Sequence, residues 1–103
     1  MSDEEERPSL RVEAEGTAAS GRLRLVDRAG NELGHMRYRR EGPKLIVIEH
    51  TEVDSSLRGR EGGRTIFQSM VAWARKTGTR VKSDCPFTTS MFKKHPSAHD
   101  ILA

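Results

Sequence analysis

Cysteine, aromatic residues and long apolar runs are all scarce in this sequence. Its 103 residues include one cysteine, Cys85, so no internal disulfide can form, and a free thiol fits the reducing cytoplasm. No apolar run is long enough to span a bilayer, and the acidic N-terminus does not have the pattern of a signal peptide. These absences predict a cytoplasmic protein with no membrane partner.

Two further absences narrow the class of ligand. The four histidines are scattered and none forms a recognised ligand pair with the lone cysteine, so we expect no metal. Aromatic residues make up only 5% of the chain, and we expect no exposed aromatic side chain to pair with the basic residues as base stacking would require. Nucleic acid is therefore a poor partner, although the net charge of +3 keeps a basic nucleic-acid-binding module as the weakest alternative.

Charge is unevenly distributed along the chain. Residues 1–9 hold four acidic side chains and one arginine, a net charge of −3, and we expect them to form a disordered acidic tail. Residues 10–103 carry the remaining +6 and are long enough for a single domain with one core. A basic domain suits an anionic partner such as a nucleotide-bearing cofactor.

Apolar and polar residues alternate through the first half of the chain, which predicts strands. Residues 10–19 predict a short edge strand, and residues 21–27 and 32–39 predict a hairpin that ends at a turn over 41–43. Residues 44–53 form the most apolar run, rich in β-branched side chains, and predict a buried central strand.

The second half of the chain is predicted to be mainly helical. Apolar residues recur with helical spacing from Gly63 to about Thr77, which predicts an amphipathic helix. Residues 79–84 predict a short strand, and Thr88 or Thr89 could cap a short helix that continues to Lys94. The order of elements predicts an α+β fold in which the main helix crosses one face of the sheet.

A glycine-rich basic turn separates the central strand from the main helix, with the sequence Leu57-Arg58-Gly59-Arg60-Glu61-Gly62-Gly63-Arg64-Thr65. The helix start offers free N–H groups and the positive end of the helix dipole, and the arginines add charge. The turn therefore predicts a phosphate or pyrophosphate site, with a merely solvated connection as the alternative. It lacks the Gly-Lys-Ser/Thr ending of a P-loop and the glycine spacing of a dinucleotide-binding fold.

Three segments together resemble one family. His50-Thr51-Glu52-Val53 ends the central strand, Leu57-Arg58-Gly59-Arg60-x-x-Gly63 follows it, and Cys85-Pro86-Phe87 precedes His95-Pro96. In this order they resemble the GNAT superfamily of acetyl-CoA-dependent N-acetyltransferases, specifically its very small YjdJ-type branch. The resemblance implies a GNAT-like mixed, mostly antiparallel sheet that is splayed at the cofactor cleft, with one main helix and one short C-terminal helix.

The resemblance also implies an activity, the transfer of acetyl from acetyl-CoA to the amine of a protein or of a small molecule. The strand end would hold the pantetheine arm, and N–H groups of the basic turn would hold the pyrophosphate. Cys85 is implied as the catalytic residue, against the simpler interpretation of a small buried apolar side chain. The cofactor-binding residues implied are Thr51, Glu52, Val53, Arg58, Gly59, Arg60, Glu61, Gly62, Gly63, Arg64, Pro86 and Phe87.

Two departures from the family pattern predict weaker function. Glu61 replaces a glycine, and a left-handed conformation there would cost roughly 1–2 kcal/mol. Its carboxylate would also repel the pyrophosphate. Met91 stands where many members have a tyrosine that can act as a general acid. A coenzyme A binder without catalysis is therefore the main alternative.

Overall fold

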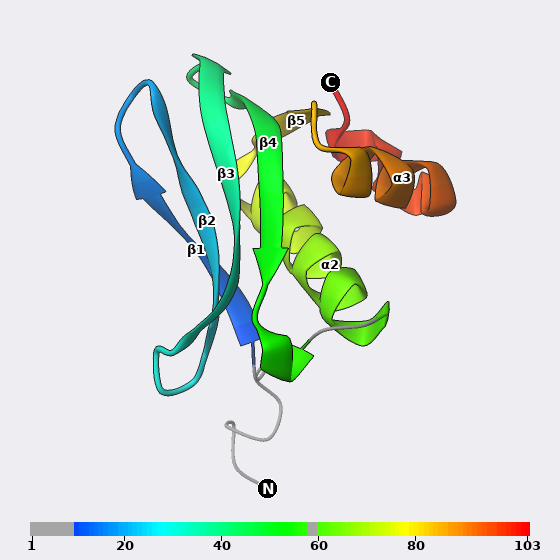
Figure 1. Ribbon diagram of the computed structural model, residues 1–103. Helices are drawn as coiled ribbons and strands as arrows, with labels where there is room; N and C mark the ends of the chain where they lie inside the picture. The colour runs from blue at the N-terminus through cyan, green and yellow to red at the C-terminus, as the bar shows by residue number, and fades with distance from the viewer. Residues whose placement is uncertain (1–9, 58–59) are drawn as a thin grey trace, which may run out of the picture.

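The computed structural model describes residues 10–57 and 60–103, and its centre is a five-stranded sheet in the order β1-β2-β3-β4-β5 (Figure 1). The strands are antiparallel to their neighbours from β1 to β4, whereas β5 is parallel to β4. Their bounds are β1 Leu10–Gly16, β2 Ser20–Asp27, β3 Glu32–Gly42, β4 Leu45–Val53 and β5 Arg80–Ser83.

Within the described residues, two α-helices cover one face of this sheet, and two short 3-10 helices adjoin them (Figure 1). The helices are η1 Ser55–Leu57, α2 Arg60–Thr77, α3 Pro86–Lys94 and η2 Pro96–Ile101. None of the helices in the described part of the chain is both long and apolar enough to cross a membrane.

The core lies between the sheet and α2, because each contributes one apolar face to it. Alternate side chains of β2, β3 and β4 point toward the helices, and the apolar stripe of α2 packs against them. The buried residues of this layer include Leu23, Leu25, Met36, Tyr38, Ile46, Ile48, Ile66, Phe67, Met70 and Ala74. The partly buried Trp73 and Phe87 pack at its margin.

The opposite face of the sheet is a network of ion pairs across neighbouring strands. Arg22 of β2 contacts Glu15 of β1 at 2.8 Å and Glu32 of β3 at 3.2 Å, while Arg39 contacts Glu49 at 3.1 Å and Asp84 at 2.9 Å. These side chains are partly exposed, so each pair contributes little to stability, and the face remains solvated.

The predicted fold class is confirmed, but three element boundaries were wrong. Strand β3 continues to Gly42, into the turn predicted over residues 41–43. Helix α2 begins at Arg60 and not at Gly63. Helix α3 begins at Pro86, with Cys85 as its N-cap in place of Thr88 or Thr89, because proline at the first helical position is already set for the helix. The tail predicted for residues 1–9 lies outside the described residues.

Candidate functional site

The parallel strands β4 and β5 separate halfway along β4. They pair from Leu45 to Ile48, and the Asp84 N–H donates a last hydrogen bond to the Ile48 carbonyl at 2.9 Å. The chain then turns into α3, whereas β4 continues to Val53. Among the described residues, no strand pairs with this second half of β4 on the side of β5. The splay predicted for the sheet is therefore present.

Cys85 lies where the two strands part. It is the N-cap residue of α3, only 5% of its surface is exposed, and its thiol donates to Thr51 Oγ1 across a distance of 3.5 Å. The Thr51 hydroxyl also shares a hydrogen bond of 3.2 Å with the hydroxyl of Thr88, in the first turn of α3. One thiol and two hydroxyls thus form a small polar cluster between β4 and α3.

The surroundings of Cys85 favour its thiolate. Burial of the side chain raises the pKa of the thiol. The backbone N–H of Thr88 and the hydroxyls of Thr51 and Thr88 lower this pKa, and so does the backbone N–H of Phe87. The lowering contributions prevail, so the pKa of Cys85 lies below its ordinary value. These causes are burial and hydrogen bonds from Thr51, Phe87 and Thr88, and no arginine of the described residues is among them.

Further hydrogen bonds fix the backbone at Cys85. The Ser83 hydroxyl donates to the Cys85 carbonyl at 3.0 Å and accepts from the Cys85 N–H at 3.2 Å. Thr89 donates its hydroxyl to Ser83 Oγ at 2.9 Å and its N–H to the Cys85 carbonyl at 2.9 Å. The sequence did not point to Ser83 or to these uses of Thr88 and Thr89, because the contacts depend on how α3 leaves the sheet.

Gly62 and Gly63 of the predicted phosphate turn lie inside the first turns of α2. A Cβ on Gly62 would overlap the Leu57 carbonyl oxygen, and one on Gly63 would stand 2.9 Å from the Phe87 ring. Both positions therefore lack a side chain because other parts of the chain pack against them. The contact of Gly63 with Phe87 brings the start of α2 beside the Cys85-Pro86-Phe87 segment.

Glu61 was expected to carry backbone strain, and that expectation was wrong. Glu61 lies in the first turn of α2, and no described residue other than glycine has a positive φ. Its side chain and that of Arg64 are exposed. Arg58 and Gly59 lie outside the described residues. Met91 is buried among the core residues of α3.

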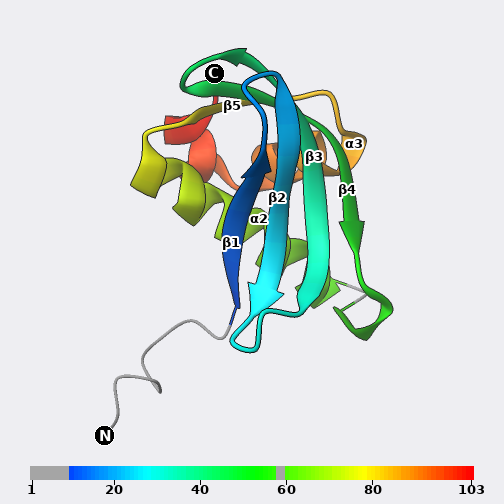
Figure 2. The ribbon, with the colours of Figure 1, turned by 90° about the vertical axis from the view of Figure 1, so that its left-hand side faces the viewer.

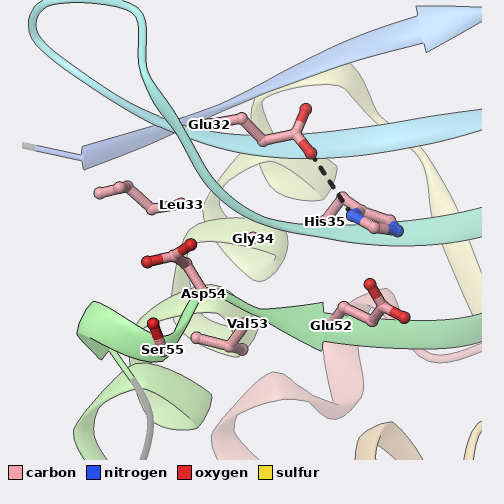
Figure 3. Close-up of a pocket in the computed structure, with 8 residues that line it drawn as sticks. All are labelled: Glu32, Leu33, Gly34, His35, Glu52, Val53, Asp54 and Ser55. Atoms are coloured by element: carbon pink, nitrogen blue, oxygen red, sulfur yellow. Dashed lines mark ion pairs between the residues drawn. The ribbon is translucent and has the colours of Figure 1, made fainter.

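A polar cleft of about 380 Å³ lies at the carboxyl end of β4 (Figure 3). Its carboxylates already have partners: Glu32 accepts from Arg24 at 2.8 Å and lies 3.4 Å from His35 Nδ1, and Glu52 lies 3.1 Å from a ring nitrogen of His50. The lining residues are Glu32, Leu33, Gly34, His35, Glu52, Val53, Asp54 and Ser55. Only two of them, Glu52 and Val53, were predicted as site residues.

No group of His, Cys, Asp or Glu side chains in the described ranges 10–57 and 60–103 is arranged to hold a metal ion.

The fold and the parting of β4 from β5 are those of an acetyltransferase of the GNAT class, and the comparisons agree. Residues 22–101 match the family model of the GCN5-related N-acetyl-transferases, so the chain belongs to this family. The solution structure of a GCN5-like protein from Staphylococcus aureus aligns with a TM-score of 0.62 at 25% identity, over 94% of this chain and 91% of that one. No curated protein matches. The finer assignment to the YjdJ-type branch stays a prediction.

Proposed function

We propose that this chain binds acetyl-CoA and transfers the acetyl group to an amine, with Cys85 as the catalytic residue. The observation that carries the proposal is the Cys85 thiol, held at the N-terminus of α3 beside the open edge of β4. Membership of an N-acetyltransferase family supports acetyl transfer in general. We place this activity in the cytoplasm, where a lone thiol stays reduced.

The coenzyme would lie along the unpaired half of β4. Thr51 and Val53 direct their backbone groups to this open side, where β5 no longer pairs with β4, and they are proposed to hold the pantetheine arm. Glu52 between them directs its backbone groups to β3, because the Asp54 N–H donates to the Leu33 carbonyl and such pairs alternate along the strands, so only its side chain could take part. The pyrophosphate would lie at the N-terminus of α2, against backbone N–H groups from Arg58 to Arg64. Pro86 and Phe87 would flank the arm, since Phe87 lies against Gly63.

The chemistry at Cys85 can be written as two displacements. The Cys85 thiolate attacks the carbonyl carbon of the thioester, the bond from that carbon to the coenzyme sulfur breaks, and coenzyme A leaves as its thiolate. The amine then attacks the carbonyl carbon of the acetyl group on Cys85, the bond from that carbon to the Cys85 sulfur breaks, and the amine loses a proton, which restores the Cys85 thiolate. In the alternative, Cys85 takes the proton while the amine attacks acetyl-CoA directly. Backbone N–H groups would stabilise the oxyanion in either route.

Calorimetry followed by a thiol-release assay tests this proposal. Titration with acetyl-CoA should give saturable heat, and a short DNA duplex should give none at physiological salt. Release of free coenzyme A over a panel of primary amines and lysine peptides should then depend on the amine. Binding without release would identify a coenzyme A binder that has lost catalysis, and binding of the duplex alone would refute the coenzyme site.

Glu61→Gln should tighten acetyl-CoA binding by a few fold. The substitution keeps the size of the side chain and removes a negative charge at the helix end proposed to hold the pyrophosphate. Two like unit charges about 4 Å apart in water repel by about 1 kcal/mol, which corresponds to a change of a few fold in affinity. The gain should shrink as salt is added, because the side chain is exposed. Isothermal calorimetry at two salt concentrations measures it. Weaker binding by the variant would contradict this prediction, because it would mean that the Glu61 carboxylate favours coenzyme binding.

Thr51→Val should raise the pKa of Cys85 in the free protein. The thiolate loses the Thr51 hydroxyl as a hydrogen-bond donor, while valine keeps the shape of the side chain. The alkylation rate of Cys85 by iodoacetamide should therefore reach its midpoint at a higher pH and fall severalfold at neutral pH. Thr89→Val is the matched control, because the Thr89 hydroxyl contacts Ser83 and not the thiol. An identical pH profile for Thr51→Val and the unaltered protein would show that the Thr51 hydroxyl does not stabilise the Cys85 thiolate.

A further inference from the structure

Strand β1 forms one edge of the sheet, and its open side has backbone groups that no described strand satisfies (Figure 2). The Thr17 N–H donates to the Ser20 carbonyl at 2.8 Å, which makes this pair at the end of the hairpin a hydrogen-bonded one. Such pairs alternate along antiparallel strands. The even-numbered residues of β1, including Val12 and Ala14, therefore direct their N–H and C=O groups away from β2, toward the open edge.

A groove of about 630 Å³ runs along this edge between β1 and α2. Its apolar floor is formed by Leu10 and Val12 from the strand and by Ala72 and Trp73 from the helix. Leu10, Val12 and Trp73 are only partly buried, and Ala14 further along the same strand face is exposed. An open strand edge beside an uncovered apolar groove is the surface that a further strand would cover.

We propose that two copies of this chain associate through β1, antiparallel about a two-fold axis at Val12, so that their sheets become continuous. In this register Val12 lies opposite Val12 of the partner subunit, and Leu10 lies opposite Ala14 of the partner subunit. Both are positions whose backbone groups face the open edge, so each pair can exchange N–H···O=C bonds. The partner subunit's inward side chains then cover the groove beside Trp73.

The charged side chains on the outer face of β1, opposite the groove, favour this register over registers with the two-fold axis at Arg11 or Glu13. Arg11 and Glu13 lie on that face and contact each other at 2.8 Å within one chain. With the axis at Val12, Arg11 lies opposite Glu13 of the partner subunit, and the four side chains alternate in sign around a square. An axis at Glu13 would set two glutamates opposite each other, and an axis at Arg11 would set two arginines, both unfavourable.

This association leaves the proposed coenzyme site open, because β1 and the β4–β5 pair lie at opposite sides of the sheet. The two proposals can therefore fail separately.

Light scattering during size-exclusion chromatography tests the association without any ligand. The unaltered protein should approach twice its chain mass of 11.6 kDa at high concentration and return to one chain mass on dilution. Arg11→Glu alone and Glu13→Arg alone should each elute as a single chain, since like charges then face each other. An equal mixture of the two variants should recover the dimer, because the new glutamate of one variant then faces the new arginine of the other. The double variant should recover the dimer as well.

Ala14→Pro provides a second, backbone-directed variant. The Ala14 N–H faces the open edge, so proline removes no hydrogen bond within β1 and β2 but does remove one across the dimer. We expect a folded single chain, checked by circular dichroism. A single chain for the unaltered protein at every concentration would overturn the proposal. So would a dimer that persists in both charge variants, since the interface would then lie elsewhere.

Discussion

Gly62→Ala should lower the free energy of unfolding by about 1–3 kcal/mol, the usual cost of overpacking. An alanine inside a helix normally stabilises it by up to about 1 kcal/mol relative to glycine. The packing at Gly62 reverses this sign, because the new Cβ would overlap the Leu57 carbonyl oxygen. Either η1 or the start of α2 must move. Urea unfolding of the free protein measures the loss.

The same substitution should also weaken acetyl-CoA binding sharply, because it displaces the N–H groups proposed to hold the pyrophosphate. Gly42→Ala is the matched control, since its Cβ would meet Leu45 Cβ at an ordinary 3.7 Å. That variant should keep both stability and affinity. If Gly62→Ala is as stable as the control, Gly62 does not pack closely against the Leu57 carbonyl oxygen. If it is destabilised but binds acetyl-CoA normally, the start of α2 is not part of the coenzyme site.

Gly62 also shows why the start of α2 was predicted too late. Glycine has low helix propensity, so Glu61-Gly62-Gly63 was interpreted as a loop. The glycines are present because Leu57 and Phe87 pack too closely for a side chain. Phe87 lies far along the chain, and a contact of this kind leaves no mark in local periodicity. The strands, in contrast, follow from alternation along the chain, and they were predicted nearly to their ends.

Only part of the polar cluster at Cys85 could be predicted from the sequence. The resemblance pointed to Cys85 and to the segment around Thr51, but not to a contact between their side chains. The Thr51 and Thr88 hydroxyls meet across 37 positions of sequence, which only the path of α3 past β4 brings about. Threonine is also a preferred N-cap, which favoured Thr88 or Thr89 as the start of α3. The stronger signal was Pro86, which places the cap at the residue before it.

Cys85→Ala should reduce turnover of acetyl-CoA and amine by about 10²–10⁴-fold, the range expected for loss of a positioned proton-transfer group. Acetyl-CoA affinity should change little, because the pyrophosphate and the pantetheine arm are proposed to bind to backbone groups elsewhere. Cys85→Ser should lose a comparable factor, since a hydroxyl at the same position is hardly ionised at neutral pH. Thiol release under saturating amine gives the turnover, and calorimetry gives the affinity.

The two routes through Cys85 differ in what accumulates when the amine is withheld. If the thiolate is the nucleophile, mixing the protein with acetyl-CoA alone should leave one acetyl group on Cys85, detectable by mass spectrometry of the intact chain and lost when an amine is added. If Cys85 acts as a base, no acetyl group should appear on it, yet Cys85→Ala should still lose turnover. A normal turnover in Cys85→Ala would exclude both routes. The cysteine would then serve only to pack α3 against β4, where it is 5% exposed, and the amine would attack the thioester without help from this thiol.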